Sequence, residues 1–145
     1  MLEFPYQAVP SAKGPPRWRP LVPVRLLAAS GRSQLFGKAL LDTGADDTVF
    51  PRSAALALQI TLAGTGKTLL WRGQAYAVES AHVELELKIQ NSVWRWPATL
   101  LFSVAPIAYP LLGQGGSLEY LDAEFLGAAR RTRLRTNSAY SGTAS

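Results

Sequence analysis

Apolar and charged residues alternate most regularly in the eight residues from His82 to Ile89. One face of this segment is apolar and the opposite face is charged. The apolar positions are Val83, Leu85, Leu87 and Ile89, and the charged positions are Glu84, Glu86 and Lys88. A period of two residues is the pattern of a β-strand with one face in the core and the other in water. We therefore predict a strand over residues 82–89.

Other segments carry weaker signals of the same kind, separated by turn-forming residues. The predicted strands cover 21–28, with Pro23 at an edge, and then 34–41, 93–102, 111–113 and 124–126. Turns are expected at 30–33 and 91–92, and short helices at 52–58 after Pro51 and at 118–123 with Ser117 as the cap. Trp94 and Trp96 share a strand face and are interpreted as packing residues. The sum is an all-β, closed-barrel domain with about seven strands and two short helices.

The chain divides by composition into three parts. Residues 1–20 contain five prolines and are expected to form an extended N-terminal lead-in across the body. Residues 21–127 carry the strand pattern and form the predicted folded domain. Residues 128–145 contain four arginines close together and are interpreted as a solvated, Arg-rich C-terminal tail.

Composition excludes several classes of function. The 145 residues include no cysteine, which rules out disulfides, thiolate metal sites and thiol nucleophiles. They include one histidine, His82. A Ser-His-Asp triad has little scope within one chain. The net charge of +5 could mark a nucleic-acid surface, but a solvated tail accounts for it, and no nucleic-acid partner is expected.

No segment is predicted to reach a membrane. The N-terminus has an acidic residue, Glu3, where a signal peptide would be basic. The longest apolar stretch, residues 100–112, is interrupted by Ser103, Pro106 and Pro110, and it is too short to span a bilayer. We expect a cytoplasmic protein without a membrane partner.

Two ligand-binding motifs are present only in part. Gly66-Lys67-Thr68 matches the end of a phosphate-binding loop, but position 61 is threonine where that motif needs glycine, and a hairpin is expected next instead of a helix. The acidic run that begins at Asp42 resembles a calcium loop, but Gly44 has no side-chain oxygen at the third position, and Ser53 stands where such a loop needs a bidentate glutamate. We predict no metal and no cofactor.

The segment from Ala39 to Phe50 presents a carboxylate on a tight turn. Apolar residues lead to Asp42, Thr43 and Gly44 make the turn, and a β-prone stretch leaves it. Two carboxylates roughly 3 Å apart cannot both ionise, and they can activate water as base and acid for peptide hydrolysis. Because this turn occurs once, a second copy of the chain would have to supply the other carboxylate across a two-fold axis.

Residues 39–49 resemble the active-site segment of retroviral aspartic proteases, the retropepsins. Arg19-Pro20-Leu21-Val22 is similar to the start of their folded body, and Leu111-Leu112-Gly113 to their second signature. Residues 113–125 also resemble the end of retropepsin-like proteins encoded in bacterial genomes. The similarity covers roughly residues 19–126, and it implies a homodimeric aspartic endopeptidase with an all-β, single-lobe fold that cleaves peptides or unfolded proteins.

The resemblance also implies roles for individual residues. Asp42, Thr43 and Gly44 would form the catalytic turn, with Thr43 bracing the two turns across the two-fold axis. Ala45, Asp46 and Asp47 would contact substrate. A glycine-containing hairpin would be the flap, with its tip either at Gly64 to Gly66 or at Gly73, and these glycines are further predicted substrate contacts.

One position departs from the retropepsin pattern. Retropepsins usually carry arginine after the glycine that matches Gly113, where it pairs with the carboxylate that matches Asp46, but this chain has Gln114. The departure removes an expected ion pair near the dimer contacts. An alternative hypothesis is therefore a catalytically inactive protein-interaction module with the same fold.

Overall fold

A computed structural model describes all residues from 1 to 145 as thirteen strands and one short helix. The early strands are β1 (Leu2–Pro5), β2 (Gln7–Val9), β3 (Arg17–Arg19), β4 (Leu21–Leu27), β5 (Ser33–Leu41) and β6 (Val49–Pro51). The helix α1 (Arg52–Ala57) precedes β7 (Ala63–Trp71), β8 (Gln74–Ile89), β9 (Ser92–Ser103) and β10 (Leu111–Leu112). The chain ends with β11 (Leu121–Leu126), β12 (Arg131–Thr136) and β13 (Thr143–Ala144).

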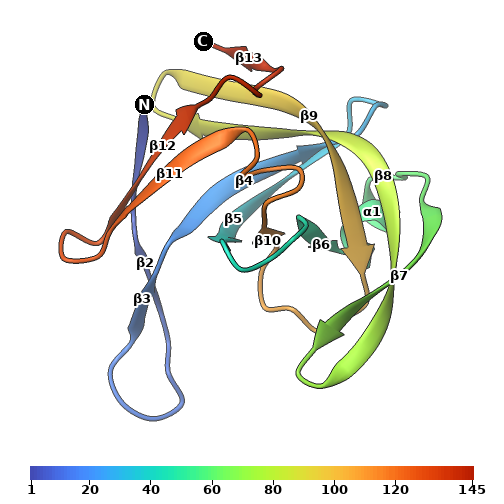
Figure 1. Ribbon diagram of the computed structural model, residues 1–145, viewed down its shortest axis with the longest axis horizontal. Coiled ribbons are helices and arrows are strands. Elements are labelled where there is room, and N and C mark those ends of the chain that lie inside the picture. The colour runs from blue at the N-terminus through green and yellow to red at the C-terminus, as the bar shows by residue number, and fades with distance from the viewer.

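Six strands close into a barrel (Figure 1). Around the ring the order is β9, β6, β10, β5, β4 and β8, and β8 pairs with β9 to complete it. Strand β7 extends the sheet beyond β8, and β13 pairs with β9. The predicted all-β fold class and closed barrel are confirmed, although the chain has more strands and one helix fewer than expected.

The barrel interior is filled by apolar side chains that alternate along the strands. The fully buried large residues include Trp96, Phe50, Phe102, Leu26, Leu85, Leu87, Leu100 and Leu112. Trp94 is buried as well, so the interpretation of both tryptophans as packing residues is confirmed. The Trp96 indole N–H donates to the Gly116 carbonyl at 2.8 Å, which satisfies its polar atom inside the core.

Glu86 is a buried carboxylate on the outer face of β8. Arg95 on β9 donates to it at 2.6 Å, and Arg25 on β4 lies 3.8 Å away. The hydrogen bond from Arg95 and the charge of Glu86 raise the pKa of Arg95. Three neighbouring strands are therefore joined by one carboxylate with two cationic partners.

Pro23 lies in a part of β4 that is open on one side, in agreement with the expected edge position. Strand β4 pairs with β8 only from Arg25 to Leu27, so Pro23 has no partner there. Its register with β5 shifts between Val22 and Val24, so Pro23 occupies a bulge. A bulged residue makes no ladder hydrogen bond, which is how a residue without an N–H is tolerated there.

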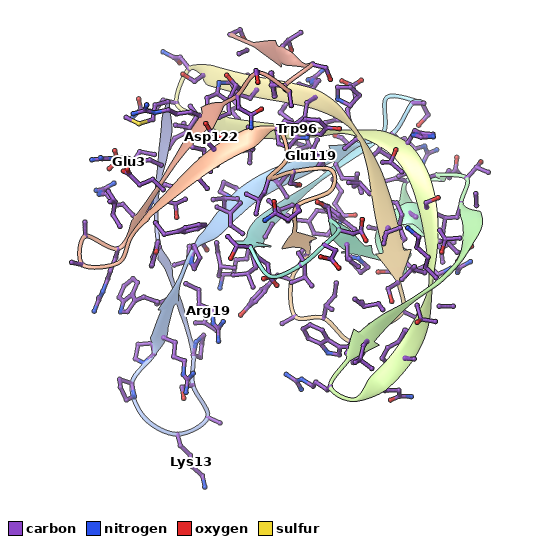
Figure 2. All side chains as sticks on the ribbon, viewed as in Figure 1. Glu3, Lys13, Arg19, Trp96, Glu119 and Asp122 are labelled. Atoms are coloured by element: carbon purple, nitrogen blue, oxygen red, sulfur yellow. The ribbon has the colours of Figure 1, made fainter.

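The N-terminal lead-in contributes to the core. Strand β1 pairs with β12, and the side chains of Leu2 and Phe4 are each 3% exposed. Beyond it, β2 and β3 form a hairpin that projects from the body, with Lys13 in its loop (Figure 2). The Gln7 side chain donates to the Leu21 and Gly37 carbonyls, which fixes the base of this hairpin.

The expectation of a solvated Arg-rich tail is wrong. Residues 131–136 form β12, the central strand of the sheet β1-β12-β11, and Leu134 is fully buried. The arginines alternate with Thr132 and Leu134, which places their side chains on the opposite face. There they pair with carboxylates: Arg131 and Arg133 lie 3.4 Å from Glu3, and Arg133 lies 3.3 Å from Glu124.

The helix expected at residues 118–123 is also absent. The Ser117 hydroxyl does not cap a helix, because it hydrogen bonds the buried Thr48 hydroxyl at 2.8 Å. Residues 117–120 make turns, and the Tyr120 carbonyl accepts from Asn137 N–H, which starts the pairing of β11 with β12. The helix predicted at 52–58 is confirmed as α1. It has six residues, and no helix here is long and apolar enough to cross a membrane.

The burial of Phe4 predicts that the N-terminal segment stabilises the fold. Phe4→Ala should lower the free energy of unfolding by about 3–5 kcal/mol, because it leaves a cavity beneath β12. Urea denaturation followed by circular dichroism would measure this. The control is Leu56→Ala, since Leu56 is an exposed leucine on α1. Equal, small effects of both substitutions would show that residues 1–5 are only loosely attached.

Candidate functional site

Asp42 lies at the end of β5, where three strands meet. Strand β10 lies between β5, which enters the Asp42 loop, and β6, which leaves it. Its pairing with β5 is parallel, and the Asp42 N–H donates to the Leu112 carbonyl at 3.0 Å. The backbone of Asp42 is therefore fixed by a strand that is distant in sequence.

The carboxylate of Asp42 is held by its own loop. The Gly44 N–H donates to Asp42 Oδ1 at 3.0 Å, and the Ala45 N–H donates to the Asp42 carbonyl at 3.2 Å. No cation lies within ion-pair distance of Asp42, Asp46 or Asp47. One carboxylate oxygen is thus oriented by a backbone amide, and the half-buried side chain carries no neutralising partner.

The glycine that follows β10 packs directly on the Asp42 loop. A Cβ atom on Gly113 would overlap the carbonyl oxygens of Asp47 and Ala45. The next two residues continue the contact, because Gln114 N–H donates to the Ala45 carbonyl at 2.9 Å and Gly115 N–H donates to the Asp46 carbonyl at 2.8 Å. The segment 113–115 therefore supports the loop from behind, and only glycine allows this approach.

Gln114 occupies the sequence position that carries arginine in the retropepsin pattern. Its side-chain Nε2 donates to the Thr43 carbonyl at 3.2 Å. Asp46 has no ion-pair partner in the chain, so the loss of that pair is a feature of the folded structure. Gln114 instead donates a hydrogen bond from its uncharged amide to the carbonyl of Thr43, the residue that follows Asp42.

A cavity of about 350 Å³ opens beside the Asp42 loop. The loop contributes one wall and the end of β7 contributes the facing wall. The lining residues are Asp42, Gly44, Ala45, Asp46, Asp47, Val49, Thr68, Leu69, Leu70, Trp71, Leu101 and Leu111. One side of the cavity is consequently acidic and the other side is apolar.

The hairpin of β7 and β8 turns at Arg72 and Gly73. Both residues have positive φ, 50° and 79°, as the two central positions of a tight hairpin turn require. Gly64 and Gly66 lie at an irregularity in the β7–β8 pairing, where the Thr65 hydroxyl donates to the Val78 carbonyl at 2.7 Å. Of the two tip positions considered from the sequence, Gly73 is the one at the turn.

The predicted site residues are only partly brought together. Asp42, Gly44, Ala45, Asp46 and Asp47 line the cavity, whereas the Thr43 side chain is exposed and is not part of the lining. Gly64, Gly66 and Gly73 do not line it either. The segment Gly66-Lys67-Thr68 is part of strand β7, so no helix N-terminus follows it to bind phosphate.

Three lining residues could not be found from the sequence. Val49 and Leu111 lie in the segments 39–49 and 111–113 that resemble retropepsin signatures, but these two residues and Leu101 were not among the predicted site residues, because each has the pattern of a core position in a strand. Their position follows from long-range pairing: β10 joins β6 at Leu111 and Val49, and β6 joins β9 at Val49 and Leu101. The three therefore form one row across adjacent strands.

A second cavity of about 320 Å³ lies on the other side of Asp47. Lys67 from β7 and Glu119 and Tyr120 from the segment after β10 are among its lining residues. The hydrogen bond to Glu119, followed by burial, raises the pKa of Tyr120. Asp47 and Leu101 line both cavities.

The chain alone supplies one oriented carboxylate at this cleft. Peptide hydrolysis by carboxylates needs a second one at hydrogen-bonding distance. No group of three or more histidine, aspartate or glutamate side chains is placed to hold a metal ion. A single chain therefore presents one oriented carboxylate with a cleft beside it.

Comparison with known proteins finds a likeness among solved structures only. No family model matches the chain, and no curated protein matches it. Among solved structures, the EIAV protease in complex with the inhibitor HBY-793 has a TM-score of 0.48 and 21% sequence identity, covering 66% of this chain and 82% of that chain. At this level the likeness assigns no activity, so the functional assignment depends on the geometry described above.

The contact of Gly113 with the loop predicts a strong effect of a single methyl group. Gly113→Ala should lower the free energy of unfolding by about 1–3 kcal/mol, because the new Cβ atom meets backbone that cannot move aside easily. Gly127→Ala is the control, since a Cβ atom there meets nothing and the φ angle is not positive. Urea denaturation compares them. Indistinguishable midpoints would contradict this packing.

Proposed function

We propose that the protein is a homodimeric, retropepsin-like aspartic endopeptidase. The observation that carries the proposal is the Asp42 carboxylate, oriented by the Gly44 N–H at 3.0 Å and presented at the floor of a cleft between its loop and strand β7. A backbone held by β10 and by Gly113 gives that carboxylate a fixed position. Fixed placement is what a water-activating group requires.

The proposed chemistry needs Asp42 from two copies of the chain. Two such carboxylates about 3 Å apart share one proton, because both cannot ionise at that distance. The ionised one takes a proton from water as it attacks the scissile carbonyl carbon, and the protonated one hydrogen bonds the carbonyl oxygen. A proton then passes to the leaving nitrogen as the C–N bond breaks, which returns the pair to its starting state.

The proposed substrate is an extended peptide or a segment of an unfolded protein. Strand β7 pairs only with β8, so its other edge offers backbone groups to an added strand. Leu69, Leu70 and Trp71 would cover apolar side chains of the substrate, and Gly44 and Asp46 would bind its backbone. In this role the β7–β8 hairpin acts as the flap.

An inactive protein-interaction module is the second candidate. The observation in its favour is that one chain holds only one oriented carboxylate, and that Gln114 replaces the charged residue expected near the dimer contacts. Such a module would bind extended peptides in the same cleft without cutting them. The two candidates differ in one measurable property, which is cleavage that depends on Asp42.

Asp42→Asn should abolish cleavage while the protein stays folded. We expect a loss of roughly 10³-fold or more in kcat/KM on a chemically unfolded protein, because the amide cannot serve as base. Glu84→Gln removes an exposed carboxylate on β8 and should leave the rate unchanged. Cleavage that persists in Asp42→Asn would contradict the aspartate dyad. Binding of peptides without cleavage by the unsubstituted chain would favour the interaction module.

Leu70→Ala should weaken substrate binding without affecting stability. Leu70 is 72% exposed and lines the cleft, so its side chain is available to cover a substrate. We expect KM for a peptide with apolar residues at the cut to rise about three- to tenfold, because each methylene removed from water contributes about 0.8 kcal/mol. Leu35→Ala is the control, an exposed leucine on β5 outside the cleft. An equal change in both variants would contradict this role of Leu70.

A further inference from the structure

Strand β11 is the edge of a small sheet that one chain completes with its own termini. The order is β1-β12-β11, with β12 in the centre, so the N-terminal strand and the C-terminal arginine-rich strand already pair with each other (Figure 1). The two outer edges of the sheet, on β1 and on β11, remain without a strand neighbour. Only these edges could extend this sheet into another chain.

The two edges differ in the backbone groups that they offer. Tyr6 N–H donates to the Arg130 carbonyl. By the alternation of an antiparallel ladder, the backbone N–H and C=O groups of Leu2 and Phe4 also point towards β12, while those of Glu3 and Pro5 point outward. Pro5 has no N–H, so the β1 edge is a poor donor. The β1 edge is therefore ill suited to pairing.

The β11 edge keeps its donors. Asn137 N–H donates to the Tyr120 carbonyl. By the alternation of an antiparallel ladder, the backbone N–H and C=O groups of Asp122 and Glu124 then point towards β12. The N–H and C=O groups of Leu121, Ala123 and Phe125 consequently point outward. All three residues can donate and accept, so this edge of β11 can accept an added strand.

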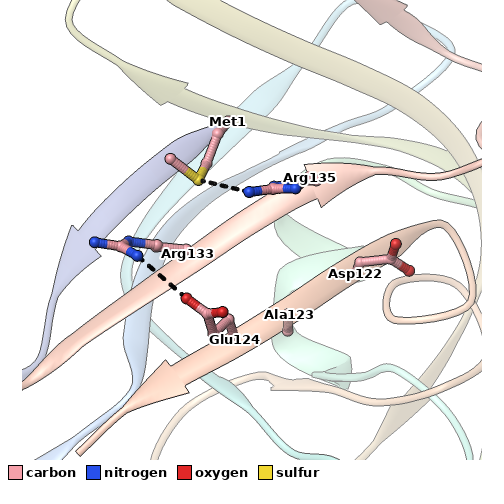
Figure 3. A pocket seen from close by; sticks show the side chains of 6 residues that line it. All are labelled: Met1, Asp122, Ala123, Glu124, Arg133 and Arg135. Atoms are coloured by element: carbon pink, nitrogen blue, oxygen red, sulfur yellow. Dashed lines mark hydrogen bonds and ion pairs between the residues drawn. The ribbon is translucent and has the colours of Figure 1, made fainter.

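The side chains of β11 also suit a protein neighbour. Leu121, Ala123 and Phe125 lie on the face that packs over Leu134 and Thr132, yet Phe125 remains 37% exposed at the open edge. On the opposite face the acidic side chains are engaged within the chain, as Figure 3 shows for Glu124 and Arg133, 3.3 Å apart. Asp122 accepts from the Asn137 side chain at 3.2 Å. Pairing at this edge would cover Phe125 without burying a charged side chain that has no partner.

We propose that β11 pairs antiparallel with β11 of a second copy of this chain, forming one continuous six-stranded sheet across a two-fold axis. The proposal rests on the proposed function in one respect: the catalytic site is incomplete without a second Asp42. The segment between Gly113 and β11 connects the two regions, because Gln114 and Gly115 bond the Asp42 loop directly. Pairing at β11 thereby fixes how the two Asp42 loops face each other.

Charge favours one register of this pairing. A two-fold axis through Ala123 would place Asp122 opposite Glu124 of the second copy, and an axis through Glu124 would oppose the two glutamates. Like charges directly opposite one another destabilise a strand pair. An axis through Phe125 avoids both and places two aromatic rings together. We therefore expect Phe125 to lie nearest to its own copy.

The absence of cysteine allows a direct test by cross-linking. In Phe125→Cys the two thiols would belong to directly opposite residues about 5.5 Å apart at Cα, which is within the range that a disulfide spans. Mild oxidation should convert most of this variant into a covalent dimer on a non-reducing gel, and Ala123→Cys should cross-link less. Leu35→Cys, at a position on β5 that is more exposed (54% against 37%), should run as a single chain without a cross-link on the same gel. Failure of both β11 cysteines to cross-link, in a protein that sediments as a dimer, would overturn the proposal.

A second variant tests the same edge without new covalent bonds. Phe125→Asp should weaken the dimer at least tenfold in Kd by sedimentation equilibrium, with an unchanged circular dichroism spectrum, whereas Leu35→Asp should not. Loss of peptidase activity should be recovered by raising the protein concentration. A Phe125→Asp protein that stays dimeric and active would refute the β11 interface and leave the proposed function standing. Cross-linked Phe125→Cys without Asp42-dependent cleavage would refute the function and leave the interface standing.

Discussion

The structure depends on the insertion of β10 between β5 and β6. This two-residue strand pairs with the strand that enters the Asp42 loop and with the strand that leaves it, and Gly113 then lies against the loop carbonyls. Without it, the Asp42 turn would be a hairpin connection at the rim of a barrel, free to adopt several conformations. With it, the carboxylate has one position, set by hydrogen bonds from residues about 70 positions away in sequence.

The same constraint links the cleft to the small terminal sheet. The chain passes from β10 through Gly113 and Gln114 directly into the turns that begin β11, and buried hydroxyls of Thr48 and Ser117 join those turns to the loop. Strands β1 and β12 pair with each other within one chain, so neither of them is exchanged with a second copy of the chain. Hydrogen bonds thus join the Asp42 loop directly to the segment that leads into β11.

Much of this could be predicted from the sequence, and the misses have physical causes. The alternation at 82–89 identified a core strand, and the Asp-Thr-Gly turn identified the loop, because both signals are local. The alternation of arginine with Thr132 and Leu134 is a strand signal too, but the high density of arginines favoured the interpretation as a solvated tail. The helix expected after Ser117 is absent because that hydroxyl binds Thr48, a partner that only the fold supplies. The apolar lining of the cleft, Val49 and Leu101 included, likewise comes from strand pairing across the barrel.

The central claim is that catalysis uses two Asp42 carboxylates from two chains. It can be tested by unfolding the protein and Asp42→Asn together in varied ratios, refolding them, and measuring cleavage of an unfolded protein at fixed total concentration. If each active site needs both carboxylates, activity should fall as the square of the unsubstituted fraction, so that an equal mixture retains about one quarter. Activity that falls in direct proportion to that fraction would mean that each chain works alone, and would contradict the account.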